Sequence, residues 1–249
     1  MGIYDRDYTQ QDDFTSHGRS GGTRWGLPQT PPVVTYLLIA NIVMFLASLI
    51  PPVNNFFYGW LAIDTTSAVK IIQAWRLITY QFLHNGFWHI FFNMLGLFFL
   101  GPTLERHWGS KRFLRFYLMC GIAGGLFYTL LSITHLLHAG MMVGASGAML
   151  GLLAACAILF PHFVVFIFVF PVPIRIAAII FIVMYILNIA AQGANAGGDA
   201  AHFAGMVAGA GYVFLMPLLE NVRLRRKGSR WEKKMAARRN LQIEVDRIL

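Results

Sequence analysis

The chain has 249 residues, of which 57% are hydrophobic and only 12% are charged. Soluble domains carry about 25% charged residues, so this chain has too few charged side chains to coat a surface that faces water. Its formal net charge of +9 raises nucleic acid as a partner, but the distribution of that charge along the chain favours a membrane instead.

The sequence divides into three parts. Residues 1–31 are polar and contain no apolar core, which favours a disordered cytoplasmic tail over a signal peptide. Residues 32–219 contain long apolar runs without the strict alternation of a membrane barrel, and they are predicted to form an all-α membrane domain. Residues 220–249 form a basic tail.

Six apolar runs are predicted to cross the membrane as helices, over residues 33–50, 87–100, 113–137, 146–160, 174–191 and 200–219. The second is expected to end at Gly101-Pro102, followed by a charged turn. The run 163–170 is too short to cross and lies between prolines, so we expect it at the membrane surface. Residues 51–86 form a long connection rich in aromatic residues, and we expect this first loop to be folded.

Lysine and arginine are distributed unevenly between the two ends of the predicted spans. Six spans place both termini on one side of the membrane, and 18 of the 20 Lys and Arg fall on that side, leaving only Lys70 and Arg76 on the other. The positive-inside rule therefore places both termini in the cytoplasm and predicts a plasma or inner membrane location. Anionic lipid accounts for the basic tail without nucleic acid.

The segment 144–147, Gly-Ala-Ser-Gly, begins the fourth predicted span. One interpretation makes Ser146 a helix cap whose hydroxyl accepts the N–H of Met149, and this segment alone favours it. The other makes Ser146 a nucleophile held against backbone N–H groups at the positive end of a helix. A base and an oxyanion hole at the same depth would favour the nucleophile.

The predicted topology brings three more polar residues to the depth of Ser146. Spans two, four and six run in the same direction, so His89, Asn93 and His202 all lie near the outer ends of their helices. Polar residues inside a span are costly and face a bundle interior or a cavity. Small residues recur at four-residue spacing in spans four and six, which permits the close packing that a serine–histidine contact requires.

These residues resemble the motifs of the rhomboid family of intramembrane serine proteases. In chain order, the shared features are Trp75-Arg76, His84-x4-His89-x3-Asn93, Gly101-Pro-Thr-Leu-Glu105-Arg106, Ser146 between Gly144 and Gly147, and His202 in Ala-Ala-His-Phe-Ala-Gly. The resemblance covers about residues 33–219. Each motif alone is weak, but all of them together, in this order and on these spans, are specific.

The resemblance implies a six-helix bundle and a role for each of these residues. Ser146 would attack the scissile peptide carbonyl and His202 would act as the general base, in a dyad without a carboxylate. The backbone N–H of Ser146, with His89 and Asn93, would form the oxyanion hole. The residues with supporting roles would be His84, Trp75, Arg76, Gly144, Gly147, Glu105 and Arg106. Substrates would be transmembrane segments of other proteins, with no cofactor or metal.

Two positions close to Ser146 or His202 in the sequence bear on how the histidine is held. Asp199 precedes His202 by three residues, and a helix cap is favoured over a third catalytic group. The family often has an aromatic residue four positions after the serine that packs on the histidine, but this chain has Leu150 there. The packing of the His202 ring is therefore left open.

Two other functions are considered beside the protease. An inactive relative would bind and retain transmembrane helices of client proteins, although the serine, the histidine and the His/Asn pair are all present here. A metal or proton-coupled transporter would use His84, His89 and His202. This second alternative is disfavoured because no further ligand residues lie at that depth except Asp199.

Overall fold

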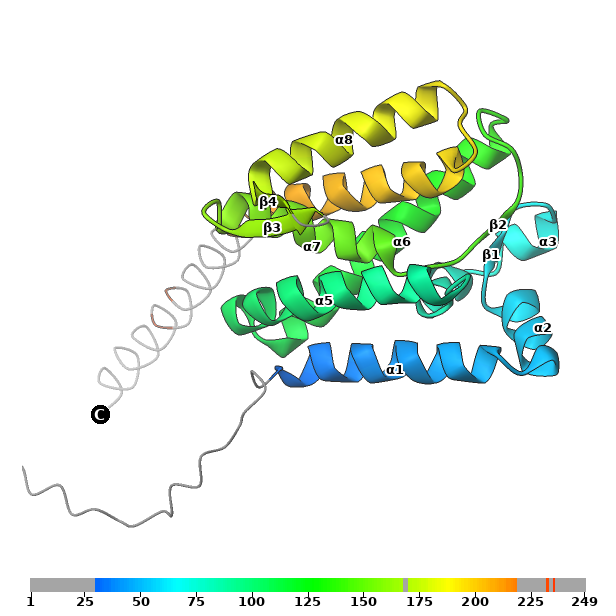
Figure 1. The fold of residues 1–249 in the computed structure, drawn as a ribbon, viewed down its shortest axis with the longest axis horizontal. Helices are drawn as coiled ribbons and strands as arrows, with labels where there is room; N and C mark the ends of the chain where they lie inside the picture. Colours follow the sequence, from blue (N-terminus) through cyan, green and yellow to red (C-terminus); the bar gives the residue numbers. More distant parts are fainter. Residues whose placement is uncertain (1–29, 168–169, 219–231, 233–234, 236–249) are drawn as a thin grey trace, which may run out of the picture.

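The structure is a computed structural model that describes residues 30–167, 170–218, 232 and 235. Most of the predicted tails, 1–31 and 220–249, lies outside the described residues. The described part contains six helices of 14 or more residues. They are α1 (Pro32–Ser48), α5 (Phe87–Trp108), α6 (Ser110–Ile133), α7 (Ser146–Leu159), α8 (Ile174–Ala190) and a last helix without a label (Ala196–Leu218). Consecutive long helices run in opposite directions (Figure 1).

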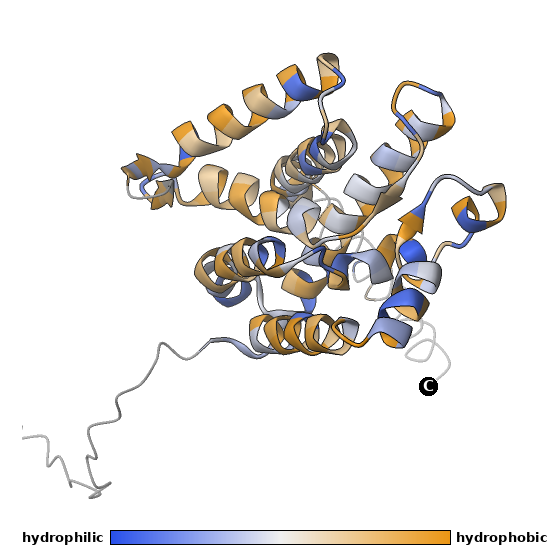
Figure 2. Ribbon diagram, turned by 45° about the vertical axis from the view of Figure 1, so that its right-hand side comes forward, coloured by the Kyte–Doolittle hydropathy of each residue, from blue (hydrophilic) through white to orange (hydrophobic). Residues whose placement is uncertain are grey.

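The helix α7 lies at the centre of the bundle, in contact with α5, α6 and α8. Ten of its 14 residues are buried, which its small residues permit because they let neighbouring helices approach closely. By contrast, α1 and α8 expose mainly apolar side chains, and Figure 2 shows hydrophobic residues along the outside of the bundle. An apolar exterior of this kind suits a lipid environment.

Three helices of the described part are long and apolar enough to cross a membrane: α5, α6 and the last helix. The helix α1 passes the same test only together with α2 (Pro51–Trp60), and this pair is bent by 120°. The apolar helices α7 and α8 are shorter, with 14 and 17 residues. The predicted runs therefore all form helices, but their lengths differ.

The second predicted span was expected to end at Gly101-Pro102, and this expectation is wrong. The helix α5 continues through Pro102 to Trp108 and meets α6 at Gly109, whose φ is +78°. Glu105 therefore lies in the helix and not in an exposed turn. Its carboxylate is 2% exposed and accepts the N–H groups of Val33 and Val34, so it caps the first turn of α1.

The first loop is folded through four short elements after α2. These are β1 (Ile63–Asp64), α3 (Ala68–Ile71), α4 (Arg76–Thr79) and the 3-10 turn η1 (Tyr80–Phe82). The buried guanidinium of Arg76 donates hydrogen bonds to the carbonyls of Gly59 and Ala62 and to the side chain of Gln73. This charged side chain thus helps to fix the loop, together with a small hydrophobic cluster, because it satisfies two backbone carbonyl groups.

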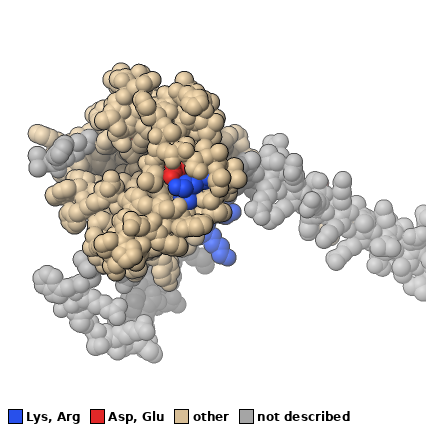
Figure 3. All heavy atoms as spheres, turned by 90° about the vertical axis from the view of Figure 1, so that its right-hand side faces the viewer, with Lys and Arg blue, Asp and Glu red and all other residues tan. Residues whose placement is uncertain are grey.

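The end of the molecule that carries the first loop displays few charged side chains (Figure 3). Lys70 and Asp64 form an ion pair of 2.7 Å there. Desolvation opposes ionisation of Asp64, but hydrogen bonds from Lys70 and Thr66 prevail and lower the pKa of this carboxyl. The strand β1 pairs with β2 (Met141–Met142), which ties the first loop to the chain just before α7.

The expectation of an all-α domain needs a correction at two places. Besides the β1–β2 pair, residues of the short apolar run form an antiparallel hairpin of β3 (Val164–Ile167) and β4 (Phe170–Pro173). A helix is disfavoured here because Pro171 and Pro173 lack N–H donors and fix an extended backbone. Phe166 and Phe170 are exposed on this hairpin, which leads directly into α8.

Glycine residues let α7 and the last helix come into backbone contact. A Cβ atom at Gly205 would overlap the carbonyl oxygen of Gly147, and one at Gly209 would lie 2.5 Å from the carbonyl oxygen of Gly151. These two contacts are one helical turn apart on each helix. The glycine spacing therefore sets the separation between the helix that carries Ser146 and the one that carries His202.

Candidate active site

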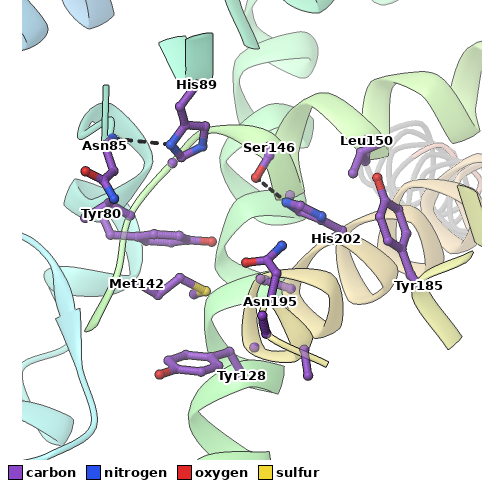
Figure 4. A pocket seen from close by; sticks show the side chains of 18 of the residues that line it. Tyr80, Asn85, His89, Tyr128, Met142, Ser146, Leu150, Tyr185, Asn195 and His202 are labelled. Carbon is purple, nitrogen blue, oxygen red and sulfur yellow. Dashed lines mark hydrogen bonds between the residues drawn. The ribbon is translucent and has the colours of Figure 1, made fainter. Parts of the chain in front are cut away.

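Ser146 is the first residue of α7, and its hydroxyl does not cap that helix. The N–H of Met149 bonds to the backbone carbonyl of Ala145, so the predicted capping bond to Ser146 is absent. Instead, Oγ of Ser146 lies 2.6 Å from Nε2 of His202 (Figure 4). This is hydrogen-bond distance between a hydroxyl and an imidazole, the geometry required for proton transfer between them.

His202 belongs to the second turn of the last helix, which begins at Ala196. Hydropathy alone had placed the helix start at residue 200, because residues 196–199 contain two glycines and an aspartate. The side chain of His202 is mostly buried and has one ring nitrogen toward Ser146. Because residues 201, 205 and 209 approach α6 and α7 closely, the backbone that carries His202 is held against the helix that carries Ser146.

The His202 ring packs against an aromatic side chain from α8. The centroids of the Tyr185 and His202 rings are 5.0 Å apart, with 57° between their planes. Tyr185 in turn stacks on Phe181 of the same helix, with centroids 5.9 Å apart. An aromatic ring is therefore present beside the histidine although position 150 is a leucine, and it comes from a different helix.

Asp199 lies inside the last helix, so the predicted role as its N-cap is wrong. Its Oδ1 is 3.3 Å from Nδ1 of His202, the ring nitrogen that faces away from Ser146. The contact is close, but it does not meet the geometry of a hydrogen bond, and Nδ1 is buried without a hydrogen-bond partner. The carboxylate accepts hydrogen bonds from the side-chain amides of Asn188 in α8 and Asn195 in the preceding loop.

His89 and Asn93 lie one turn apart in α5 and line the same cavity as Ser146. Nδ1 of His89 accepts the backbone N–H of Asn85 at 3.3 Å, so a neutral His89 carries its proton on Nε2. This Nε2 lies against Gly144, where a Cβ atom would be 2.6 Å away. The side-chain amide of Asn93 donates one hydrogen bond to the carbonyl of His89, which leaves its second N–H as a further donor.

Gly144 holds the chain at the entrance to α7. Its φ is +128°, a conformation that residues with a side chain rarely adopt, and its N–H bonds to the carbonyl of Tyr80. A side chain at this position would also occupy the space between His89 and Ser146. Glycine is therefore favoured at position 144 both by the backbone conformation and by the lack of space for a side chain.

His84 precedes α5 and is 3% exposed, and neither ring nitrogen has a hydrogen-bond partner in the described structure. Its ring lies edge-on to that of His89, with centroids 5.0 Å apart. Burial, and secondarily the neighbouring His89, lower the pKa of His84 to about 3. His84 is therefore a neutral packing residue beside His89 and does not line the cavity.

Ser146, His202, His89 and Asn93 all line one cavity of about 720 Å³. Its other walls come from Tyr80, the chain between α6 and α7, and the loop between α8 and the last helix (Figure 4). Of the residues given supporting roles, Gly144 and Gly147 line this cavity, whereas Trp75, Arg76, Glu105 and Arg106 do not. Trp75 donates from its indole to the carbonyl of Trp60, and Glu105 and Arg106 lie in the last turns of α5.

Sequence reasoning missed three residues that contact His202 or Asp199. Tyr185 and Asn188 are three positions apart in α8 and therefore share a face, and Asn195 lies in the following loop. A polar pair inside an otherwise apolar run could have pointed to this face. Among the described residues, no group of three or more His, Cys, Asp and Glu side chains is arranged to hold a metal ion.

Three curated relatives are similar to this chain. Rhomboid protein 1, mitochondrial, of Saccharomyces cerevisiae is 33% identical over 148 residues, which cover 57% of this chain and 41% of that protein. RHOMBOID-like protein 1 of Arabidopsis thaliana is 40% identical over 94 residues, covering 38% and 23%. Rhomboid protease GluP of Bacillus subtilis is 36% identical over 127 residues, covering 50% and 24%. The chain thus matches less than half the length of each of these relatives.

The Rhomboid domain family model matches residues 72–218. This range is more than half of the chain, and it contains every residue of the cavity described above. The apolar helices agree with a family of membrane proteins. The chain belongs to the rhomboid family and is a multi-pass membrane protein.

Proposed function

We propose that the protein is an intramembrane serine endopeptidase that cleaves transmembrane segments of other membrane proteins. The observation that carries the proposal is the 2.6 Å distance between Oγ of Ser146 and Nε2 of His202 inside a cavity. A helix-capping serine would not need an imidazole at this distance. The family includes relatives named as proteases, which supports the same activity.

In the proposed reaction, Nε2 of His202 accepts the hydroxyl proton of Ser146 as Oγ bonds to the peptide carbonyl carbon. The carbonyl π electrons move to the oxygen, which becomes an oxyanion. His202 then gives its proton to the leaving amine as the C–N bond breaks. A water molecule repeats the addition and releases Ser146. No cofactor is needed for this sequence.

The developing oxyanion has three candidate donors. Ser146 is the first residue of α7, so its own N–H has no partner within the helix. The Nε2 proton of His89 and the free amide proton of Asn93 line the same cavity. Donors that are fixed in place before the reaction stabilise the transition state without the cost of reorganising solvent. We therefore assign His89 and Asn93 to the oxyanion hole.

We further propose a topology of six spans with both termini in the cytoplasm of a plasma or inner membrane. The alternating direction of the long helices and the charge-poor first-loop end support it. At about 1.5 Å per residue, the 14 residues of α7 extend roughly 21 Å, less than the roughly 30 Å of a hydrocarbon core. Ser146 would then lie below the outer surface, with the cavity as its access to water.

An inactive relative that only binds client helices is the alternative function. Cleavage of a single-span model substrate in proteoliposomes separates the two. Under the proposal, Ser146→Ala and His202→Ala abolish cleavage, whereas both variants still bind the substrate and keep the wild-type melting temperature within a few degrees. Cleavage that persists in Ser146→Ala would refute the proposed protease.

A further inference from the structure

We propose that Asp199 is a positioning residue for the general base His202. Ser146 and His202 carry out the chemistry, and the carboxylate of Asp199 orients the imidazole. This inference rests on the proposed function. Asp199 would hold the Nδ1 proton of His202, which keeps Nε2 free to accept the proton of Ser146. It would also stabilise the positive charge that forms on the imidazole.

The geometry places Asp199 on the correct ring nitrogen. Nε2 of His202 faces Ser146 at 2.6 Å, and Nδ1 faces Oδ1 of Asp199 at 3.3 Å. Nδ1 is buried and has no other polar partner in the described structure. Catalytic hydrogen bonds are often long before substrate binds, so a contact of 3.3 Å is compatible with a hydrogen bond that tightens in the substrate complex.

The carboxylate is itself held from two sides. The amide of Asn188 in α8 donates to Oδ2, and the amide of Asn195 donates to Oδ1 at 3.2 Å. Asp199 is only 7% exposed, and burying a charged carboxylate costs free energy. The two amide donors offset part of that cost. Two amides that donate to the same carboxylate also fix its plane and aim Oδ1 at His202.

No other carboxylate of the described chain can take this role. Asp64 is paired with Lys70 in the first loop, and Glu105 caps α1 near the far end of α5. Neither lines the cavity, and the remaining described carboxylate, the exposed Glu232, does not line it either. When Ser146 transfers its proton, the O–H bond breaks, an Nε2–H bond forms and the ring becomes an imidazolium. Asp199 stays ionised throughout and accepts the Nδ1–H hydrogen bond.

A structural role is the competing explanation, because Asn188 and Asp199 also link α8 to the last helix. The two roles differ in what a change of charge does. Asp199→Asn keeps the size of the side chain and its ability to bond to Asn188, but it loses the negative charge. A positioning role predicts a lower kcat with an unchanged KM, whereas a structural role predicts a lower melting temperature.

The test compares Asp199→Asn, Asp199→Glu and wild type for cleavage of a single-span substrate and for melting temperature. We expect kcat of Asp199→Asn to fall about tenfold or more with KM within twofold of wild type. Asp199→Glu restores the charge and should recover part of kcat. Asp64→Asn is the matched control, since it removes the charge of a buried carboxylate away from the cavity and should lower the melting temperature without changing kcat.

Two results would overturn the inference while leaving the protease intact. One is a kcat of Asp199→Asn within twofold of wild type. The other is an equal loss in Asp199→Asn and Asp199→Glu that follows a fall in melting temperature. If the wild-type protein shows no cleavage that depends on Ser146, the proposed function itself fails, and the role of Asp199 fails with it.

Discussion

The ring of Tyr185 in α8 packs against the ring of His202 in the following helix, with centroids 5.0 Å apart. The stacking of Tyr185 on Phe181 fixes this ring in turn. Tyr185 thus provides the aromatic contact that the leucine at position 150 does not. The orientation of His202 therefore depends on how α8 packs against the last helix.

Replacing Tyr185 should lower activity through the orientation of His202. We expect Tyr185→Leu to reduce kcat severalfold, because leucine removes the aromatic ring that contacts the imidazole. Tyr185→Phe keeps the ring and should retain most of the activity. The measurement is kcat for a single-span substrate at equal amounts of folded enzyme, and equal activity of Tyr185→Leu and wild type would show that the contact is dispensable.

A side chain at Gly144 should disrupt the proposed oxyanion hole. Gly144→Ala strains a backbone with a φ of +128° and puts a Cβ atom 2.6 Å from Nε2 of His89. We expect cleavage to fall by about 100-fold or more, the effect of losing an oxyanion donor.

Gly86→Ala is the matched control for Gly144→Ala. Its φ of +99° imposes similar strain, but a Cβ atom there meets nothing within 4 Å. The control should lose some stability and keep kcat. Equal losses of kcat in both variants would mean that backbone strain, and not the His89 contact, explains the effect.

The contact between α7 and the last helix should be sensitive to a single methyl group. Gly205→Ala would overlap the carbonyl of Gly147, so the helices must separate, and we expect destabilisation of about 1–3 kcal/mol. Separation should also lengthen the Ser146–His202 contact and lower kcat. Gly211→Ala in the same helix meets nothing within 4 Å and should leave the melting temperature unchanged or higher. The two melting temperatures, measured in the same detergent, check the difference.

Burial of His84 should make the stability of the folded protein depend on pH. Its pKa is lowered to about 3 in the folded state, against an ordinary value near 6.5. Its contribution is fully present above pH 6.5 and is lost as pH falls toward 3, because only the unfolded state then binds the proton. The slope is about 1.4 kcal/mol per pH unit for one proton.

His84→Gln should remove this part of the pH dependence. Thermal unfolding of wild type and variant from about pH 7.5 to about pH 4.5, which spans the ordinary histidine pKa of about 6.5, gives two slopes to compare. The wild-type melting temperature should fall more steeply with acid than that of the variant. Parallel curves would contradict a buried, neutral His84.

The sequence predicted the positions of the long helices and several residues of the cavity. It predicted the helix ends and the contacts between distant segments less well. Apolar runs locate helices because lipid leaves the backbone no other partner, and Ser146 and His202 belong to recognisable motifs. The start of the last helix was misplaced by four residues because small and polar residues continue the helix beyond the apolar run. That error made Asp199 look like a cap.

Other differences between prediction and structure come from contacts between distant segments. Glu105 looked like part of a charged turn, but it caps α1, which lies more than 70 residues earlier in the chain. Tyr185 could not be paired with His202 from spacing, because the relative rotation of two helices decides that contact. The hairpin of β3 and β4 arose from a short apolar run whose periodicity does not distinguish a strand from a helix.

The most direct test of the account is covalent labelling of Ser146 by a fluorophosphonate probe, with the modified residue identified by mass spectrometry. We expect an adduct on Ser146 in the wild-type protein and a labelling rate about 100-fold or more lower in His202→Ala, because this variant lacks the proposed general base. An unlabelled wild-type protein, or a labelling rate that does not depend on His202, would contradict the assignment of Ser146 as the nucleophile.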